Sequence, residues 1–135
     1  MSKTSKEIQG DIFQLIKNSN LNSMITGSIY RAGYRPKDSN LEDVVIIFTT
    51  GLADQIETGV VTINIFVPDI DNYISGNKIE NGQRCEQLEQ AAENWVESIS
   101  VSTNYKFKLK QTIYTENEPE IKQHFVVIKL GYKFF

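Results

Sequence analysis

The chain has 135 residues, of which 40% are hydrophobic and 23% are charged, and its net charge at neutral pH is −3. This length and composition are typical of one globular domain whose core needs no disulfide or metal to hold it. The net negative charge argues against a protein that binds DNA through its overall charge, and it leaves open only a local basic face.

The cysteine content and the N-terminal sequence bear on the compartment. One cysteine is present, so no disulfide forms within the chain, as is typical of a reducing compartment. Residues 1–18 lack the apolar core of a signal peptide. No stretch of the chain approaches the ~20 apolar residues of a membrane span. We therefore expect a protein made in the cytoplasm, with no signal peptide and no membrane partner.

The first predicted element is a short amphipathic helix. Thr4 and Glu7 have the spacing of a capping box, in which each side chain bonds the other residue's backbone N–H. The apolar residues that follow lie on one helical face: Ile8, Ile12, Leu15 and Ile16. Short polar residues from Asn18 to Asn22 compete for backbone hydrogen bonds and predict the end of the helix.

Three strands are predicted next, over Ser28–Gly33, Asp43–Thr50 and Ile56–Pro68. The second contains an unbroken apolar run, which indicates a strand covered on both faces. The third alternates, and its apolar face consists of Val61, Ile63, Ile65 and Val67. A polar loop from Arg35 to Glu42 leads into the second strand, because Pro36 disfavours helical geometry in the residue before it.

A polar segment and a helix follow the third strand. Residues Asp69 to Gly82 are rich in glycine and asparagine and predict a mobile surface loop. The most regular helical pattern of the chain runs from about Gln83 to Ser100. Its apolar face holds Leu88, Ala92, Trp95 and Ile99, and its opposite face holds four glutamates, Glu86, Glu89, Glu93 and Glu97.

Two strands complete the predicted fold, over Tyr105–Thr115 and Gln123–Phe135, joined by a turn at Pro119. The first carries aromatic and aliphatic residues on one face and Lys106, Lys108 and Lys110 on the other. We expect the two strands to pair as an antiparallel hairpin. The sequence thus predicts an α+β fold of order α-β-β-β-α-β-β, in a single domain over 1–135. Its sheet is mostly antiparallel or mixed, with two helices packed on it.

No residue is predicted to be catalytic or to bind a cofactor or metal. His124 is the only histidine, and we interpret it as a strand residue with a satisfied ring, since no triad is visible. Cys85 lies near a helix start beside glutamates, which favours a half-buried structural thiol over a reactive one. One cysteine and one histidine are too few for a zinc site. The oxygen-rich segments Asp69–Asp71 and Asp38–Asn40 lack the spacing of a calcium loop and are interpreted as solvated turns.

The lysines and glutamates admit several interpretations. The three lysines can form a solvated face that resists aggregation, bind phosphate, or meet an acidic partner. The four glutamates can line a solvated helix face, although like charges one turn apart repel weakly. If the glutamates of one subunit meet the lysines of the next, the contact joins two different surfaces and orients a ring.

The segment from Gly27 to Asp71 resembles a family of small structural proteins of tailed phages and prophages. The resemblance is carried by Gly27–Tyr30, by the loop Arg35–Ser39, by Glu42–Val45 and by Gly59–Asp69. The predicted order of helices and strands is also similar to that of phage tail-terminator and head–tail joining proteins.

The resemblance implies a non-enzymatic virion protein, assembled in the cytoplasm of a bacterial host. Such proteins form a ring, typically a hexamer, that caps the tail tube and joins it to the head, with tail tube and head–tail connector proteins as its partners. DNA passes through the lumen as a polymer that is not specifically bound, and no cofactor is expected. The loop residues Arg35, Lys37 and Asp38, and the loop Asp69–Gly82, are the expected contacts with neighbours, because polar loops on a rigid sheet commonly carry binding.

Other classes are compatible with the same sequence. One is a different head–tail joining or connector protein. Another is a binding module unrelated to phages, which holds a small ligand or a protein between helix and sheet. An enzyme is disfavoured because no acid–base or nucleophile set is visible. The oligomeric state in solution separates a ring from a monomeric module.

Overall fold

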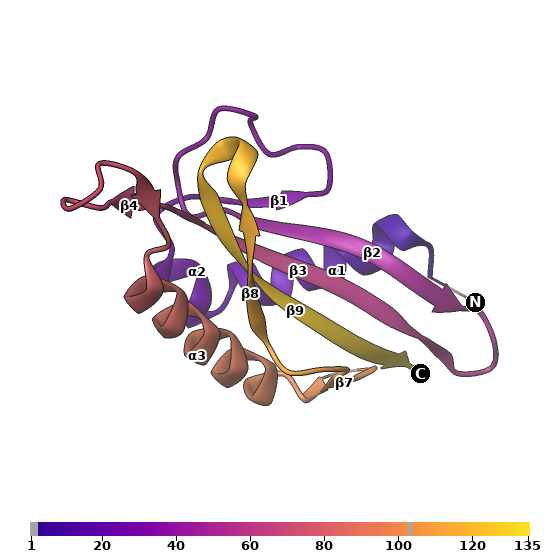
Figure 1. The fold of residues 1–135 in the computed structure, drawn as a ribbon. Coiled ribbons are helices and arrows are strands. Elements are labelled where there is room, and N and C mark those ends of the chain that lie inside the picture. The colour runs from indigo at the N-terminus through magenta and orange to yellow at the C-terminus, as the bar shows by residue number, and fades with distance from the viewer. Residues whose placement is uncertain (1–2, 103) are drawn as a thin grey trace.

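A curved, seven-stranded sheet carries helices on one of its faces (Figure 1) in the computed structural model, which describes residues 3–102 and 104–135. Its strand order is β1-β2-β3-β9-β7-β6, and β8 also pairs with β9. Strands β1 and β2 run parallel, and the other pairs are antiparallel. The predicted α+β class with a mostly antiparallel, mixed sheet is confirmed.

Helix α1 (Ser5–Lys17) begins at the predicted capping box, since Thr4 accepts from the Glu7 N–H and Glu7 accepts from the Thr4 N–H. Ile8, Ile12 and Ile16 are buried. A short second helix, α2 (Asn20–Met24), follows at once and is not predicted. The polar residues that end α1 therefore do not prevent another turn, because the apolar Leu21 within it is buried. No helix of the described residues is long and apolar enough to cross a membrane.

The three predicted strands after α2 are present as β1 (Ile29–Arg31), β2 (Val44–Leu52) and β3 (Glu57–Pro68). The apolar face of β3 is fully buried, with Val61, Ile63, Ile65 and Val67 at 0–1% exposure. We call this side of the sheet the helix face and the other side the open face. Both faces of β2 are covered only along its first three residues, and the strand is exposed from Thr49 onward.

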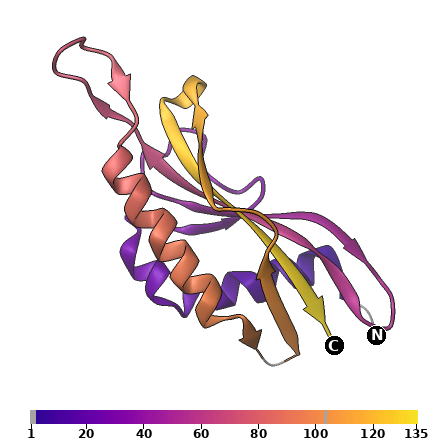
Figure 2. The same cartoon turned by 60° about the horizontal axis from the view of Figure 1, so that its bottom comes forward.

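The predicted loop after β3 contains an ordered hairpin. Strand β4 (Ile70–Asp71) pairs with β5 (Lys78–Ile79), and the hairpin projects from the body beside the start of α3 (Figure 2). The segment Asp69 to Gly82, which is predicted to be a surface loop, is mostly exposed but contains two short strands that the sequence does not predict. The polar residues that indicate a loop belong to the turn, where the Asn72 N–H donates to the Asn77 carbonyl and Gly76 has a φ of 75°.

Helix α3 (Gly82–Ser98) is followed by β6 (Val101–Ser102), β7 (Tyr105–Leu109) and β8 (Tyr114–Glu118), a 3₁₀ turn (Pro119–Ile121), and β9 (Gln123–Phe134). The predicted antiparallel pairing with the last strand is confirmed, but the predicted single strand is two strands. β8 pairs with the first half of β9 and β7 with the second half. Between them the chain bulges over residues 110–113, so two more residues lie on this edge than on the facing part of β9.

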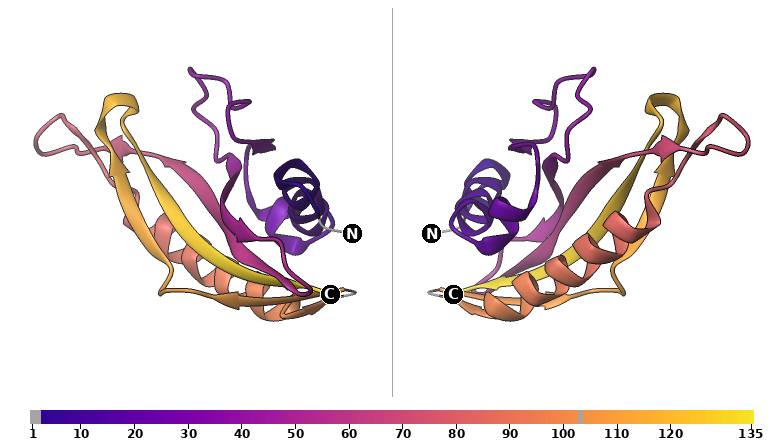
Figure 3. Two further views of the ribbon diagram at one scale, coloured as in Figure 1. Left: turned by 90° about the vertical axis from the view of Figure 1, so that its right-hand side faces the viewer. Right: turned by 90° about the vertical axis from the view of Figure 1, so that its left-hand side faces the viewer.

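Helices α1 and α3 pack on the helix face, where the indole N–H of Trp95 donates to the Leu15 carbonyl at 3.4 Å. The predicted apolar face of α3 is buried through Leu88, Ala92, Trp95 and Ile99. Strands β3 and β9 bend along their length (Figure 3). The hydrophobic core fills the space between helices and sheet.

Candidate interaction surfaces

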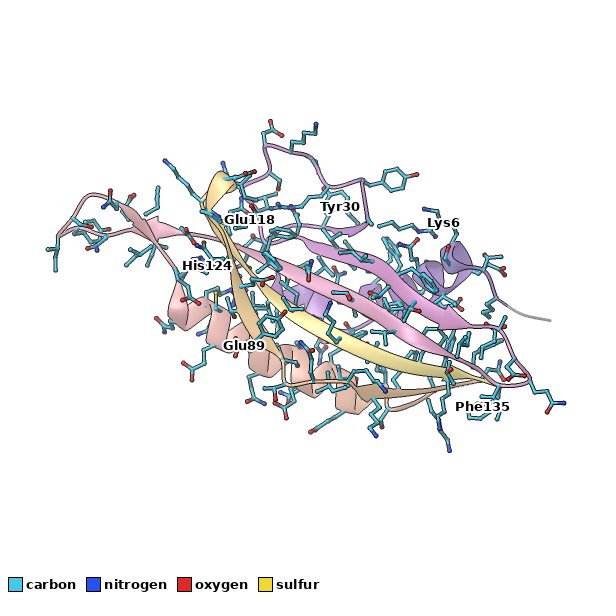
Figure 4. The ribbon with its side chains drawn as sticks, turned by 45° about the vertical axis from the view of Figure 1, so that its right-hand side comes forward. Lys6, Tyr30, Glu89, Glu118, His124 and Phe135 are labelled. Atoms are coloured by element: carbon cyan, nitrogen blue, oxygen red, sulfur yellow. The ribbon has the colours of Figure 1, made fainter. Side chains whose placement is uncertain are left out.

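The only histidine makes a structural contact. His124 Nδ1 lies 2.7 Å from Asp69 Oδ1, which joins the start of β9 to the base of the β4–β5 hairpin. This is the satisfied ring that the sequence predicts, and Figure 4 shows it at the end of the sheet opposite Phe135. Within residues 3–102 and 104–135, no three His, Cys, Asp or Glu side chains gather closely enough to hold a metal ion.

The cysteine is buried at the start of α3, with Cys85 at 2% exposure. Burial, reinforced by the nearby charge of Glu80, raises the pKa of the thiol to about 12. The thiol is therefore protonated at neutral pH and is a poor nucleophile. The predicted half-buried structural cysteine is in fact fully buried.

The loop from Ala32 to Asp43, which we call the Arg-Pro loop, is fixed to the open face by an arginine. Arg35 donates to Asp43 and to Gln123, at 2.9 Å in each case. Its guanidinium lies 4.0 Å from the ring centre of Phe66. The Asp43 side chain is 0% exposed, so this ion pair is buried on the acidic side. Arg35 thus serves contacts within the chain.

The two other predicted contact residues of this loop have a different placement. Lys37 and Asp38 are exposed, and neither has an ion-pair partner among the described residues. Both side chains are therefore accessible to another molecule, and their contact with a neighbour stays a prediction.

A second arginine joins three elements. Arg84 donates to both carboxylate oxygens of Glu42, at 2.7 and 2.9 Å, and to the carbonyl of Met24. These bonds connect the Arg-Pro loop with α2 and α3, and the hydrogen bond with Glu42 raises the pKa of Arg84. No pattern of the sequence singles out Arg84, because Arg84 and Glu42 are far apart along the chain.

The four glutamates of α3 form the predicted acidic face, and Figure 4 marks its member Glu89. Glu86, Glu93 and Glu97 are exposed. Glu89 is half-buried and accepts a hydrogen bond from the Thr115 hydroxyl of β8 at 2.5 Å. Three of the four carboxylates are therefore free to meet solvent or a partner.

The predicted lysines lie within a larger basic surface on the open face. Lys106 stands opposite Lys133 of β9, and the stem of Lys110 lies over Gly131. Lys129 on the same face donates to Thr62 at 3.1 Å. We call this set the lysine face: Lys106, Lys108, Lys110, Lys129 and Lys133. None of the five forms an ion pair with a described residue.

The alternation of residues in the sequence predicts three of these lysines but not the other two. Lys129 and Lys133 are spaced four apart in a mostly apolar strand, and only the register of β7 against β9 brings them beside the others. The acidic and lysine faces lie on opposite sides of the sheet but approach each other at the bulge, where Lys110 and Glu93 border one shallow hollow.

A groove of about 1300 Å³ runs between α1 and α3. Its apolar lining includes Leu15, Leu21, Met24, Ala91, Trp95 and Ile99. Amide side chains form most of the remainder, among them Gln14, Asn18, Gln87, Gln90 and Asn94. Tyr105 of β7 and Phe134 of β9 also line the groove, so it opens between the helices and reaches the edge of the sheet.

The turn of the β4–β5 hairpin presents two large apolar side chains to solvent. Tyr73 and Ile74 are each 98% exposed, more than any other large hydrophobic residue of the chain that the structure describes. Ile70 and Ile79 in the hairpin strands are also exposed, at 43% and 42%. Exposed apolar side chains gathered at one place mark an interaction site in many soluble proteins.

The chain was compared with protein families, curated proteins and solved structures, and no family is shown for it. No protein-family model matches the chain, and no curated protein matches it. Among solved structures, a protein whose name describes no function aligns with 95% of this chain and 94% of its own, at 12% identity and a TM-score of 0.49. A likeness at this level carries no argument about function.

Proposed function

We propose that this protein is a non-enzymatic structural subunit that assembles with copies of itself into a ring. We further propose that the ring is a phage tail terminator, which caps the tail tube and joins it to the head. Tail tube and connector proteins are then its neighbours in the virion. DNA passes through the ring without specific binding, which suits the net charge of −3.

The separation of charge on the chain carries this proposal. The acidic face lies on α3, which covers the helix face of the sheet. The lysine face lies on the open face of the sheet. A contact between two different surfaces of one chain is head-to-tail and closes into a ring when the rotation permits. Opposite charges on the two surfaces speed association and fix the register of the contact.

The resemblance over Gly27 to Asp71 supports the more specific part of the proposal. This segment forms β1, β2 and β3 together with the Arg-Pro loop. Arg35 holds the loop in place, and the exposed Lys37 and Asp38 at its turn offer charged groups to a neighbouring virion protein.

The groove between α1 and α3 favours a second candidate, a binding module that acts as a monomer. Its volume of about 1300 Å³ exceeds the ~300–1,000 Å³ of most small-molecule sites. A peptide segment is therefore a better match for this groove than a small ligand.

The mass in solution tests the proposed function. Size-exclusion chromatography with light scattering should give a mass several-fold above the 15.4 kDa of one chain. Negative-stain images should show annuli. A 15.4 kDa species at every concentration, without annuli, would overturn the ring and favour the binding module.

A further inference from the structure

The β4–β5 hairpin is built to present its tip. The Asn72 side chain accepts from the Ile74 N–H at 3.0 Å, and the Asn72 carbonyl accepts from the Gly76 N–H at 2.7 Å. Asp69 fixes the base of the hairpin to His124 at 2.7 Å. Because the backbone of the turn is held by its own hydrogen bonds, little conformational entropy is lost when Tyr73 and Ile74 enter a partner.

The tip carries no net charge. Residues 72–77 contain no charged residue in a chain that is 23% charged. The nearest charged side chains, Asp71 and Lys78, form an ion pair with each other at 2.8 Å. The surface that surrounds Tyr73 and Ile74 is therefore made of asparagine, serine and glycine, which suits the uncharged centre of an interface.

The groove between α1 and α3 has the matching character. Leu21, Trp95 and Ile99 are apolar lining residues that are buried and form its floor, and exposed lining residues, mainly uncharged amides such as Gln87, Gln90 and Asn94, form its rim. Lys3 and Asp11, which both line the groove, form an ion pair at 2.6 Å. Among the described lining residues, Glu86 is then the charged side chain without an ion-pair partner. An apolar floor with a polar, uncharged rim is the composition of a protein–protein contact rather than of an ion-binding site.

We propose that Tyr73 and Ile74 of one copy insert into the α1–α3 groove of a second copy. This inference rests on the self-assembly proposed above and names one of its contacts. The hairpin projects away from the body (Figure 2), and Tyr73 and Ile74 at its tip are each 98% exposed, so they do not occupy the groove of their own chain. The contact is therefore between copies and joins two different surfaces, as a ring requires. Helix α3 borders both the groove and the acidic face, so both proposed contacts use the same side of the receiving copy.

Disulfide capture between two different variants tests the insertion directly. One preparation carries Ile74→Cys and the other carries Ala91→Cys, which lies in the groove. Mixed under mild oxidation, they should give a covalent dimer that joins one chain of each kind. Cys85 stays out of this reaction because it is 2% exposed.

The matched control places the second cysteine on α1 outside the groove. Lys6 is exposed (Figure 4) and does not line the groove. Lys6→Cys mixed with Ile74→Cys should form at least roughly tenfold less of the mixed dimer. Equal yields for the two mixtures would overturn the proposed insertion.

A pair of variants measures how much the tip contributes. Tyr73→Ser with Ile74→Ser should raise the concentration at which the oligomer dissociates by more than roughly tenfold, because buried aromatic anchors dominate interface affinity. The fold should be unaffected, since both side chains are 98% exposed. Tyr34→Ser is the matched control, because Tyr34 is another exposed tyrosine, at 70%, on the Arg-Pro loop.

The outcomes separate this inference from the proposed function. An oligomer that forms, resists the tip substitutions and gives no Ile74–Ala91 crosslink overturns the insertion and leaves the ring standing. The tip would then face a different virion protein. A chain that stays monomeric at every concentration overturns both proposals.

Discussion

Burial decides what the cysteine can do. Cys85 lies near the start of a helix, where an exposed thiol would become more acidic. Instead, burial raises its pKa to about 12. Position along a helix is visible in the sequence, whereas burial follows from packing against the rest of the fold.

The raised pKa predicts a loss of stability in alkali. The native state holds the Cys85 proton more tightly than the unfolded chain, so this stabilisation is complete below the ordinary thiol pKa of about 9 and is lost as pH rises toward about 12. Urea unfolding at pH 7 and at pH 10.5 should show a smaller alkaline loss for Cys85→Ala than for the wild type. An identical pH dependence for the two proteins would contradict the buried thiol.

Two tyrosines also contribute to the loss of stability in alkali, so the effect of the cysteine has to be measured as a difference between the wild type and Cys85→Ala. Burial raises the pKa of Tyr105, which also donates to Asp11 at 2.5 Å, and burial raises the pKa of Tyr132. Both remain in the Cys85→Ala variant. The difference between variant and wild type therefore reports on the thiol alone.

At the scale of the element, the Arg-Pro loop depends on one ion pair. Arg35→Ala should lower the free energy of unfolding by about 3–5 kcal/mol, because it leaves the buried Asp43 carboxylate without its cationic partner. Denaturant unfolding measures this loss. Lys37→Ala, on the exposed part of the same loop, should change stability by less than about 0.5 kcal/mol.

Neutralising the carboxylate gives a further check on this loop. Asp43→Asn added to Arg35→Ala should recover part of the loss, since the second change removes the uncompensated charge. A loss below about 1 kcal/mol for Arg35→Ala alone would show that water or Ser39 solvates Asp43 adequately.

At the scale of the whole molecule, the charged faces can be reversed without disturbing the core. Lys106→Glu with Lys108→Glu should weaken the proposed ring strongly, because both exposed side chains then repel the acidic face. Lys6→Glu with Lys17→Glu makes the same change in net charge on α1 and should have little effect. Light scattering at low salt and at about 1 M salt measures both, since salt screens a contact between exposed charges.

An oligomer that ignores the lysine reversal and the salt would show that both charged faces are simply solvated. The hairpin contact would then account for assembly by itself. The two sets of variants share no residues, so the contributions of charge and of the apolar tip can be measured independently.

The sequence by itself determined the main elements and their buried sides. Capping of α1 by Thr4 and Glu7 is local, and the apolar faces of β3 and α3 follow from periods of two and 3.6 residues. Such patterns depend on neighbours within a few positions, so they can be recognised without knowledge of the fold. The α+β class follows from the order of these elements.

The tertiary structure alone decided which side chains meet. Arg35 reaches Gln123, and Arg84 reaches Glu42, across long separations in sequence. Register also brings Lys133 beside Lys106. The exposed hairpin tip and the groove were likewise decided by the tertiary structure. Exposure and concavity depend on how distant elements pack, and no local period of the sequence records that packing.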